Sequence, residues 1–306
     1  MVGAVSLMDF VNQSEDKMRK GLIMKVTNES VFLRILTFIP VDGFSYEYGE
    51  LSTLGGIAFR GLNESYISDP GVVNPKIETL SIFGGQISVD RQLANKGGGI
   101  ARVNAIMGKI RRAGLHFDKY CIQGDPAVNT KQFYGLNARL AGAQVIYPAA
   151  DAGNGGALAL ADVDSLIDRV VGPNNKKVLI MNKADRRGLK KAALTQGARW
   201  ASINDVGKSI EQYDSVPIEV LDEDGDEAPI LGKNETRGSS SLTSSMYCIR
   251  PGEDTEGEYV QGLIGSKMIE HEAQGVRGTV YIDIVEMNGS LAMFHGRAAA
   301  RLAGIL

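Results

Sequence analysis

The sequence has few residues of the kinds that build catalytic and metal sites. Its 306 residues include three histidines, two cysteines and one tryptophan. Two cysteines are too few for a disulfide scaffold, and Cys121 and Cys248 lack CxxC spacing, so we expect two free thiols in a reducing compartment. No Gly-x-Ser-x-Gly or His-Glu-x-x-His motif is present, and the three histidines lack metal-ligand spacing. We therefore predict no catalytic residue, no metal site and no cofactor.

Long apolar runs and a strong charge of one sign are also missing. No stretch approaches the roughly 20 apolar residues that a bilayer span needs, and the first residues lack the basic flank and apolar run of a signal peptide. We expect no membrane contact and a protein made and kept in the cytosol. The 33 basic and 36 acidic groups give a net charge of -3, which argues against a dedicated nucleic-acid binder. With 43% hydrophobic residues, the chain suits a globular protein of about two domains.

Glycine is present in clear excess. There are 37 glycines in 306 residues, about 12%, whereas about 7% is average. Many lie in clusters at the edges of apolar segments, and such clusters mark turns, hinges and close backbone approaches. The residues that we predict as hinges are Gly55, Gly56, Gly84, Gly85, Gly97, Gly98 and Gly99.

Hydrophobic periodicity predicts a mixed α and β fold. It predicts helices over 100–115, 162–171 and 185–196, the last ended by Gly197, and strands over 77–89, 177–182, 217–221 and 245–249. A β-branched and aromatic run predicts a further strand over 31–38, ended by Pro40. The dipeptide Asn288-Gly289 predicts a hairpin turn between two strands in 279–293.

Residues 43–75 lack a continuous apolar face and carry tyrosines, Phe59 and repeated glycines between weakly alternating residues. This pattern predicts a long two-stranded hairpin that reaches away from the body. Isolated two-stranded ribbons are marginal in water, so we expect a neighbouring molecule to hold it.

The helix predicted over 100–115 lies in a basic part of the chain. Residues 91–119 contain seven basic residues and one acid, Asp118. One interpretation is a solvated helix face. The other is a charged surface that meets an acidic neighbour or an enclosed polyanion.

Two motifs resemble ligand sites but are incomplete. Asn182-Lys183-Ala184-Asp185 follows an apolar strand, as the guanine-reading motif of a GTPase does, but the sequence has no Gly-x-x-x-x-Gly-Lys-Ser/Thr loop to hold phosphates. A nucleotide-dependent α/β enzyme that uses Lys183 and Asp185 is therefore the weaker hypothesis. Residues 222–227 hold five acids, but the glycine and the closing glutamate of a calcium loop are misplaced or missing, which favours a solvated acidic turn.

Several stretches, taken in order, resemble the major capsid proteins of tailed phages of the Hong Kong 97 type. DAGNGGALALADVDSLIDRVVG followed by KKVLIMNKADRRGL resembles the start of their axial domain. QFYGLNARL resembles the connection before that domain, and FGGQISVDRQLAN the strand that enters the long spine helix. SSMYCIRPG and the final strand GTVYIDIVEMNGSLAMFHGRAAARLAGI follow in the same linear order. The resemblance covers most of the chain and rests on this joint order.

The resemblance implies an α+β, Hong Kong 97-type capsid fold. Residues 1–30 would be an N-terminal arm and 43–75 an extended loop. Residues 31–42, 76–144 and 271–306 would form a peripheral domain with a long spine helix, and 145–270 an axial α/β domain. The extended loop and the basic helix would then carry the intersubunit contacts. The predicted contact residues are Tyr46, Tyr48, Phe59, Arg60, Tyr66, Arg102, Lys109 and Arg112.

The resemblance also implies a function. The chain would be a structural protein that self-assembles into pentamers and hexamers of an icosahedral shell around phage double-stranded DNA, contacted non-specifically. Its partners would be copies of itself, a scaffolding protein, a portal and a decoration protein. It would be assembled in the host cytoplasm and located in the virion. An encapsulin-like nanocompartment with a protein cargo is the alternative, because it resembles the same fold.

Two departures from the family limit what carries over. Some members cross-link their subunits covalently through a lysine in the extended loop. Residues 43–75 contain no lysine, so we expect no covalent cross-link. Some members begin with a scaffolding segment that is cleaved during maturation, whereas this sequence starts with the arm. We expect either a separate scaffolding protein or an already mature chain.

Overall fold

A computed structural model describes residues 30–53, 55–66, 68, 71–96, 100–197, 200–205, 208–221, 223–224, 228–252 and 259–306. The expected arm over 1–30 therefore lies outside the described residues, apart from Ser30. The predicted hinges Gly97, Gly98 and Gly99 and most of the acidic turn over 222–227 also lie outside them.

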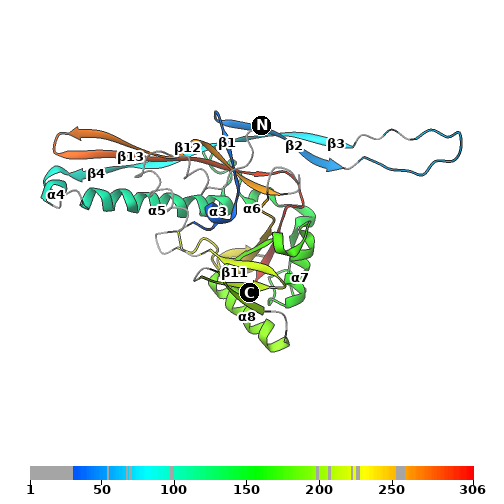
Figure 1. The fold of residues 1–306 in the computed structure, drawn as a ribbon. Helices are drawn as coiled ribbons and strands as arrows, with labels where there is room; N and C mark the ends of the chain where they lie inside the picture. Colours follow the sequence, from blue (N-terminus) through cyan, green and yellow to red (C-terminus); the bar gives the residue numbers. More distant parts are fainter. Residues whose placement is uncertain are drawn as a thin grey trace.

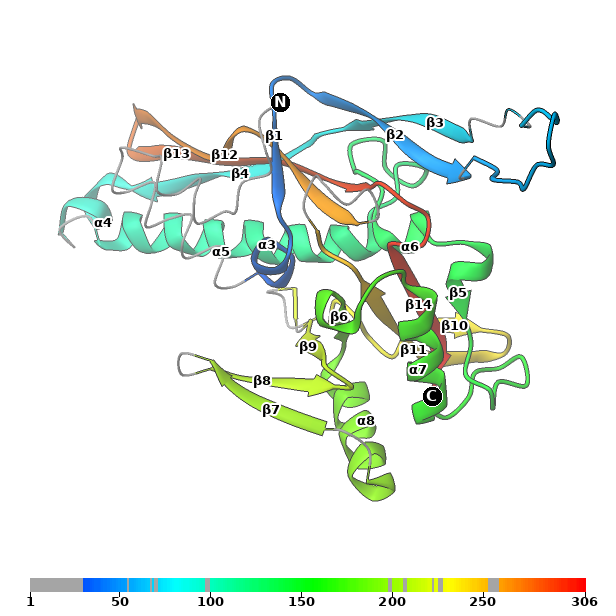
Figure 2. The ribbon, with the colours of Figure 1, turned by 45° about the vertical axis from the view of Figure 1, so that its right-hand side comes forward.

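A long helix packs along one face of a four-stranded sheet (Figures 1 and 2). The strands are, in spatial order, β1 (Phe38–Val41), β12 (Val260–Arg277), β13 (Val280–Met293) and β4 (Ser81–Asp90). The short helix α4 (Arg91–Lys96) follows β4 and precedes the long helix α5 (Ile100–Gln123). The helix predicted over 100–115 thus forms and continues for two more turns.

The buried stripe of α5 explains where the helix lies. Ile106, Ile110, Ala113, Phe117 and Cys121 repeat at intervals of three or four residues and are all buried. Residues at this spacing share one face of a helix, and that face turns toward the sheet. Because the apolar stripe continues to Cys121, the helix remains on the sheet beyond the segment that we predicted.

The second part of the molecule is an eight-stranded sheet flanked by two helices, α7 (Leu160–Arg169) and α8 (Lys183–Gln196). Its strands are, in order, β5 (Val145–Ile146), β14 (Ala299–Ile305), β11 (Ser240–Ile249), β6 (Val178–Met181), β9 (Val216–Val220), β8 (Lys208–Tyr213) and β7 (Trp200–Asp205), and β10 (Glu235–Arg237) pairs with β11. The turn that ends α8 is glycine-dependent, because Gly197 caps the helix with φ 65°.

The predicted hairpin is present. β2 (Ser45–Thr53) and β3 (Val72–Thr79) pair with each other in an antiparallel, two-stranded sheet, with Ser45 opposite Thr79 at the root. Figure 1 shows this ribbon and its connecting loop extending away from both larger sheets. Smaller elements complete the chain: α3 (Val31–Ile35), α6 (Leu136–Arg139) and two 3-10 turns, η1 (Gly142–Gln144) and η2 (Asn174–Lys176).

Three predictions of local structure are wrong. Residues 31–35 form the helix α3 instead of a strand, because Ser30 and the distant Asp118 satisfy the amides of its first turn. Pro40 does not end a strand but lies inside β1, which is possible because β1 is an edge strand with only one neighbour. Asn288-Gly289 is no turn either, since Gly289 pairs with Ser81 on one side and with Ile264 on the other.

The true turn between β12 and β13 falls at Gly278, whose φ is 64°.

The sheets also divide the chain differently from the expected domain boundaries. β12 begins at Val260 in the four-stranded sheet, and β14 returns to the eight-stranded sheet although 271–306 was assigned to the other domain. Strand periodicity reports one buried face but does not report which sheet buries it.

Gly84, one of the predicted hinges, has a packing role. Gly84 and Gly85 lie within the continuous ladder between β4 and β13. A Cβ atom at Gly84 would lie 2.2 Å from the carbonyl oxygen of Val285, so only glycine allows the two backbones to approach here. That these positions also bend, as Gly55 and Gly56 at the loop would, stays a prediction.

Candidate functional site: the protruding hairpin and its root

Large apolar side chains are fully exposed on the loop at the end of the hairpin. Ile57, Phe59 and Leu62 have relative exposures of 100%, 108% and 98%. Val73 and Ile77 on β3 are more than half exposed as well, at 60% and 66%. Soluble monomers rarely leave a contiguous apolar surface uncovered, and such surfaces mark interaction sites. The hairpin is therefore the strongest candidate for a contact with another molecule.

The predicted contacts Arg60 and Tyr66 lie together in the same loop. The Arg60 guanidinium stands 5.1 Å from the centre of the Tyr66 ring, and its Nη1 donates to the carbonyl oxygen of Glu64 at 3.0 Å. The amide of Gly61 donates to Glu64 Oε2 at 2.7 Å. These local contacts give the exposed loop a shape without covering its apolar side chains.

The root of the hairpin is held by a buried polar cluster. Arg139 at the end of α6 donates from Nη1 and Nη2 to the two carboxylate oxygens of Glu78 on β3, at 2.6 and 2.7 Å. Its Nη2 also donates to the carbonyl oxygen of Leu291 on β13 at 2.7 Å. The Tyr48 hydroxyl on β2 lies 3.1 Å from Glu78 Oε1 and 3.2 Å from the carbonyl oxygen of Met293.

The structure places the Tyr48 ring inside its own chain, and a contact of Tyr48 with another subunit stays a prediction. Its ring is buried and packs on Phe294, with 4.6 Å between the ring centres, and Phe294 packs on Tyr259 at 4.8 Å. Burial and the neighbouring Glu78 carboxylate raise the pKa of the Tyr48 hydroxyl above its usual range. Tyr46, two residues earlier on the same face, is half-buried beside it at 6.2 Å. Tyr48 thus anchors the hairpin inside its own chain.

The basic residues of α5 have different surroundings. Arg102 forms a bidentate ion pair with the buried Asp283 on β13, at 2.7 and 2.6 Å, and lies 4.9 Å from the Tyr281 ring. The hydrogen bonds from Arg102, with one from His271 at 3.0 Å, hold the pKa of Asp283 below its usual range. Arg102 therefore connects α5 to its own sheet, while its contact with another subunit stays a prediction.

Lys109 and Arg112 are exposed on the face of α5 that lies beside β4. With Gly84, Gly85 and His116 they line a half-open cavity of about 280 Å³. Burial first, and then the positive charges of Lys119 and Arg112, lower the pKa of His116. Lys109 and Arg112 on α5, like Arg60 in the hairpin loop, are predicted contact residues that lie exposed at the surface.

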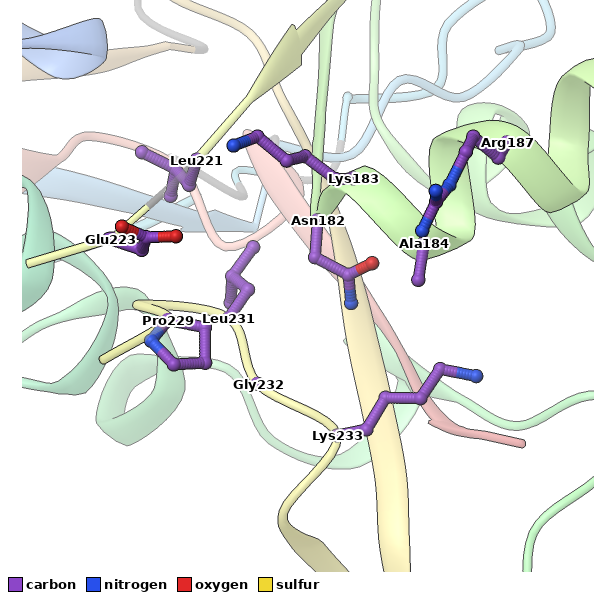
Figure 3. A pocket seen from close by; sticks show the side chains of 10 residues that line it. All are labelled: Asn182, Lys183, Ala184, Arg187, Leu221, Glu223, Pro229, Leu231, Gly232 and Lys233. Atoms are coloured by element: carbon purple, nitrogen blue, oxygen red, sulfur yellow. The ribbon is translucent and has the colours of Figure 1, made fainter. Parts of the chain in front are cut away.

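The GTPase-like motif caps a helix. Asn182 Oδ1 accepts from the amide of Asp185 at 2.7 Å, which closes the first turn of α8. Asp185 Oδ2 in turn accepts from Asn182 Nδ2 and from the Ser244 hydroxyl, each at 2.7 Å. A cavity of about 260 Å³ lies beside this turn, lined among others by Lys183 and Glu223 (Figure 3). Because Asp185 is buried and bonded within the chain, it is not placed to read a base.

Among the described residues, no group of side chains is arranged to hold a metal ion, and no helix is long and apolar enough to cross a membrane. No protein-family model and no curated protein sequence matches this chain.

Solved structures do match over nearly the whole chain. The SrpI encapsulin from Synechococcus elongatus PCC 7942 superposes with a TM-score of 0.63 and 18% identity, over 90% of this chain and 86% of that one. The capsid of a native GTA particle gives a TM-score of 0.65 and 11% identity, over 91% of both chains. The capsid of cyanophage A-1(L) gives 0.58 and 12%, over 88% and 90%. This chain has a Hong Kong 97-like capsid fold.

The capsid fold expected from the resemblance is therefore confirmed in general. Identities of 11% to 18% establish the fold alone. The names spine helix for α5, extended loop for the hairpin, and peripheral and axial domain for the parts built on the four- and eight-stranded sheets remain assignments by resemblance.

Sequence reasoning missed a buried acid in the C-terminal part of α5 of this capsid fold. Asp118 accepts from the Ser30 hydroxyl at 2.6 Å and from the amides of Val31 and Phe32 at 2.8 and 3.0 Å. It thereby satisfies the first turn of α3 from across the core. Burial raises the pKa of Asp118 to about 6, although these donors act in the opposite direction. The only available signal was that Asp118 is the single acid in a basic segment.

Titration of Asp118 should make stability pH-dependent. Its pKa is about 6 in the folded chain against 3.8 for an unperturbed carboxyl, so the folded chain binds the proton more tightly. This contribution to stability is present below about pH 4 and is lost as the pH rises through about 6. Relative to Asp118→Asn, which cannot titrate, the unfolding free energy of the natural chain should fall by about 2 kcal/mol between pH 4 and 7. Urea unfolding of both chains across this range measures it, and parallel profiles would refute the assignment.

Proposed function

We propose that this chain is a major capsid protein, which self-assembles into pentamers and hexamers of an icosahedral shell that encloses phage double-stranded DNA. The observation that carries the proposal is the fully exposed apolar loop, Ile57 to Leu62, on a protruding ribbon of a capsid fold. A ribbon of this kind cannot cover its own side chains, but another copy of the chain can. No reaction is assigned to the protein, which acts by forming a container.

Other parts of the proposal follow from the same resemblance. The four-stranded sheet with α5 would be the peripheral domain, the eight-stranded sheet the axial domain, and the hairpin the extended loop laid across a neighbouring subunit. A scaffolding protein, a portal and a decoration protein would be partners. Lys109 and Arg112 would meet an acidic surface of a neighbour or the packaged DNA. The protein would be assembled in the host cytoplasm and located in the virion.

An encapsulin-like shell is the second candidate, because the holo-SrpI encapsulin complex is among the similar structures. The two candidates differ in what the shell encloses. Particles purified after expression with the neighbouring genes, treated with nuclease and then opened, should release protected double-stranded DNA if the chain is a phage capsid protein. Release of one abundant protein and no protected DNA would favour the encapsulin. Portal, protease and terminase genes beside this one would support the phage reading.

Assembled particles should fall apart completely in hot detergent. The loop over 43–75 contains no lysine, so it cannot supply the amine for an isopeptide bond to a neighbour. Denaturing electrophoresis of particles should therefore give one band at the chain mass of 32.8 kDa. A ladder of covalent oligomers that survives reducing agent would contradict this prediction.

A further inference from the structure

The short helix α6 is bonded to the hairpin at one end and to the eight-stranded sheet at the other. At its end, Arg139 uses four of its five N–H donors, two on Glu78, one on the Leu291 carbonyl and one, from Nε at 2.9 Å, on the Tyr134 carbonyl. Near its start, Asn137 accepts a hydrogen bond from Arg301 on β14.

Arg301 continues this chain of contacts into the second sheet. Its Nη2 is paired with Glu235 on β10 at 2.9 Å, and its Nε donates to the Ser245 hydroxyl on β11 at 3.0 Å. A continuous set of ion pairs and hydrogen bonds therefore runs from the root of the hairpin, through α6, to three strands of the eight-stranded sheet.

The Glu78–Arg139 pair is better suited to fixing the orientation of the hairpin than to stabilising the folded chain. The side chains are only 6% and 10% exposed, so desolvation offsets much of their attraction. The planar fork of an arginine, held on both oxygens of one carboxylate, permits a narrow range of orientations. β2 has nine residues, about 30 Å at 3.3 Å per residue, so a rotation of about 10° at the root would move its far end by about 5 Å.

We propose that Glu78 and Arg139 are a positioning pair that sets the angle of the hairpin relative to the eight-stranded sheet, and thereby the curvature at which subunits join. The second half of this inference rests on the proposed function as a shell subunit. The first half concerns the single chain and is independent of assembly.

The test replaces both members of the pair at once. Removing one member alone would leave a buried, unpaired charge and would unfold part of the chain. The double variant Glu78→Met/Arg139→Met leaves no unpaired charge, and apolar replacement of buried pairs is often neutral or stabilising. The matched control is Arg34→Met/Glu219→Met, which removes an ion pair between α3 and β9 that does not touch the hairpin.

Spin labels report the hairpin angle in dissociated subunits. Labels at Ser65→Cys in the exposed loop and at Ser165→Cys on α7 span the hairpin and the second sheet, and both native cysteines are buried away from the reagent. We expect one narrow distance distribution in the parent and control chains, and a distribution about twofold wider or shifted in the double variant. Equal distributions in all three chains would overturn the positioning role.

Particle diameter, measured by negative-stain microscopy, tests whether the hairpin angle sets the curvature at which subunits join. At an unchanged melting temperature, the double variant should give a broader range of diameters or open fragments, and the control should match the parent. Uniform particles of parental diameter despite a widened hairpin angle would overturn the link to curvature. If the parent chain itself never assembles, the proposed function fails, while the spin-label result still decides the role of the pair.

Discussion

Replacing Ile57, Phe59 and Leu62 together by serine should abolish assembly without lowering the stability of the subunit. All three side chains are fully exposed in the single chain, so their removal costs the fold nothing. If each is buried when subunits join, each contributes about 1.5–3 kcal/mol, and the triple change removes roughly 5–9 kcal/mol per contact. That corresponds to a loss of at least about 1,000-fold in affinity.

Sedimentation of the triple variant, over the concentrations at which the parent chain assembles, measures this effect. Val128→Ser is the matched control, because Val128 is also 83% exposed but lies in the loop after α5, away from the hairpin. The control should assemble like the parent. Normal particles from the triple variant would show that the exposed loop is not an assembly contact.

Phe117→Ala should have the largest effect on the fold itself. The side chain is completely buried on the C-terminal part of α5 and packs beside three other aromatic rings. Its ring centre lies 6.2 Å from Phe38 on β1, 6.2 Å from Phe83 on β4 and 5.8 Å from Phe133. Truncating a phenylalanine in such a core costs about 3–5 kcal/mol, because the cavity cannot close when the helix is fixed between elements.

Urea unfolding of dissociated subunits checks this prediction, as a lower midpoint with an unchanged slope. Phe59→Ala provides a control with the same chemistry, since Phe59 is fully exposed and should leave the midpoint where it is. Phe117→Ala should therefore lower the stability of the subunit, and Phe59→Ala should leave it unchanged. An equal midpoint for Phe117→Ala and the parent chain would contradict the described core.

The parts of the fold that were predictable are those whose signal is local. The apolar stripe of α5 and the glycine cap at the end of α8 act within a few residues, and both are found as expected. The errors occur where a distant partner decides. Residues 31–35 become a helix because Asp118, 87 residues from Val31, caps their amides, and Asn288-Gly289 becomes strand because β4 and β12 pair with it on both sides.

In the candidate site, too, features with a local sequence signal were predictable and features that depend on a distant partner were not. Low apolar continuity and isolated aromatic residues indicated the hairpin, and its antiparallel pairing is as predicted. The sequence could not separate Tyr48 from Phe59, because the packing of Tyr48 depends on Phe294 at the far end of the chain. Arg139 was missed for the same reason, since its partner Glu78 lies 61 residues away and its environment arises only in the folded chain.

Analytical ultracentrifugation of the purified protein over a range of concentrations, with negative-stain microscopy of the fast-sedimenting fraction, tests the central claim most directly. The proposed function predicts capsomers and closed, uniform shells that disappear with the loop substitutions. A stable monomer at every concentration, with no capsomers or shells even when a scaffolding protein is supplied, would contradict it.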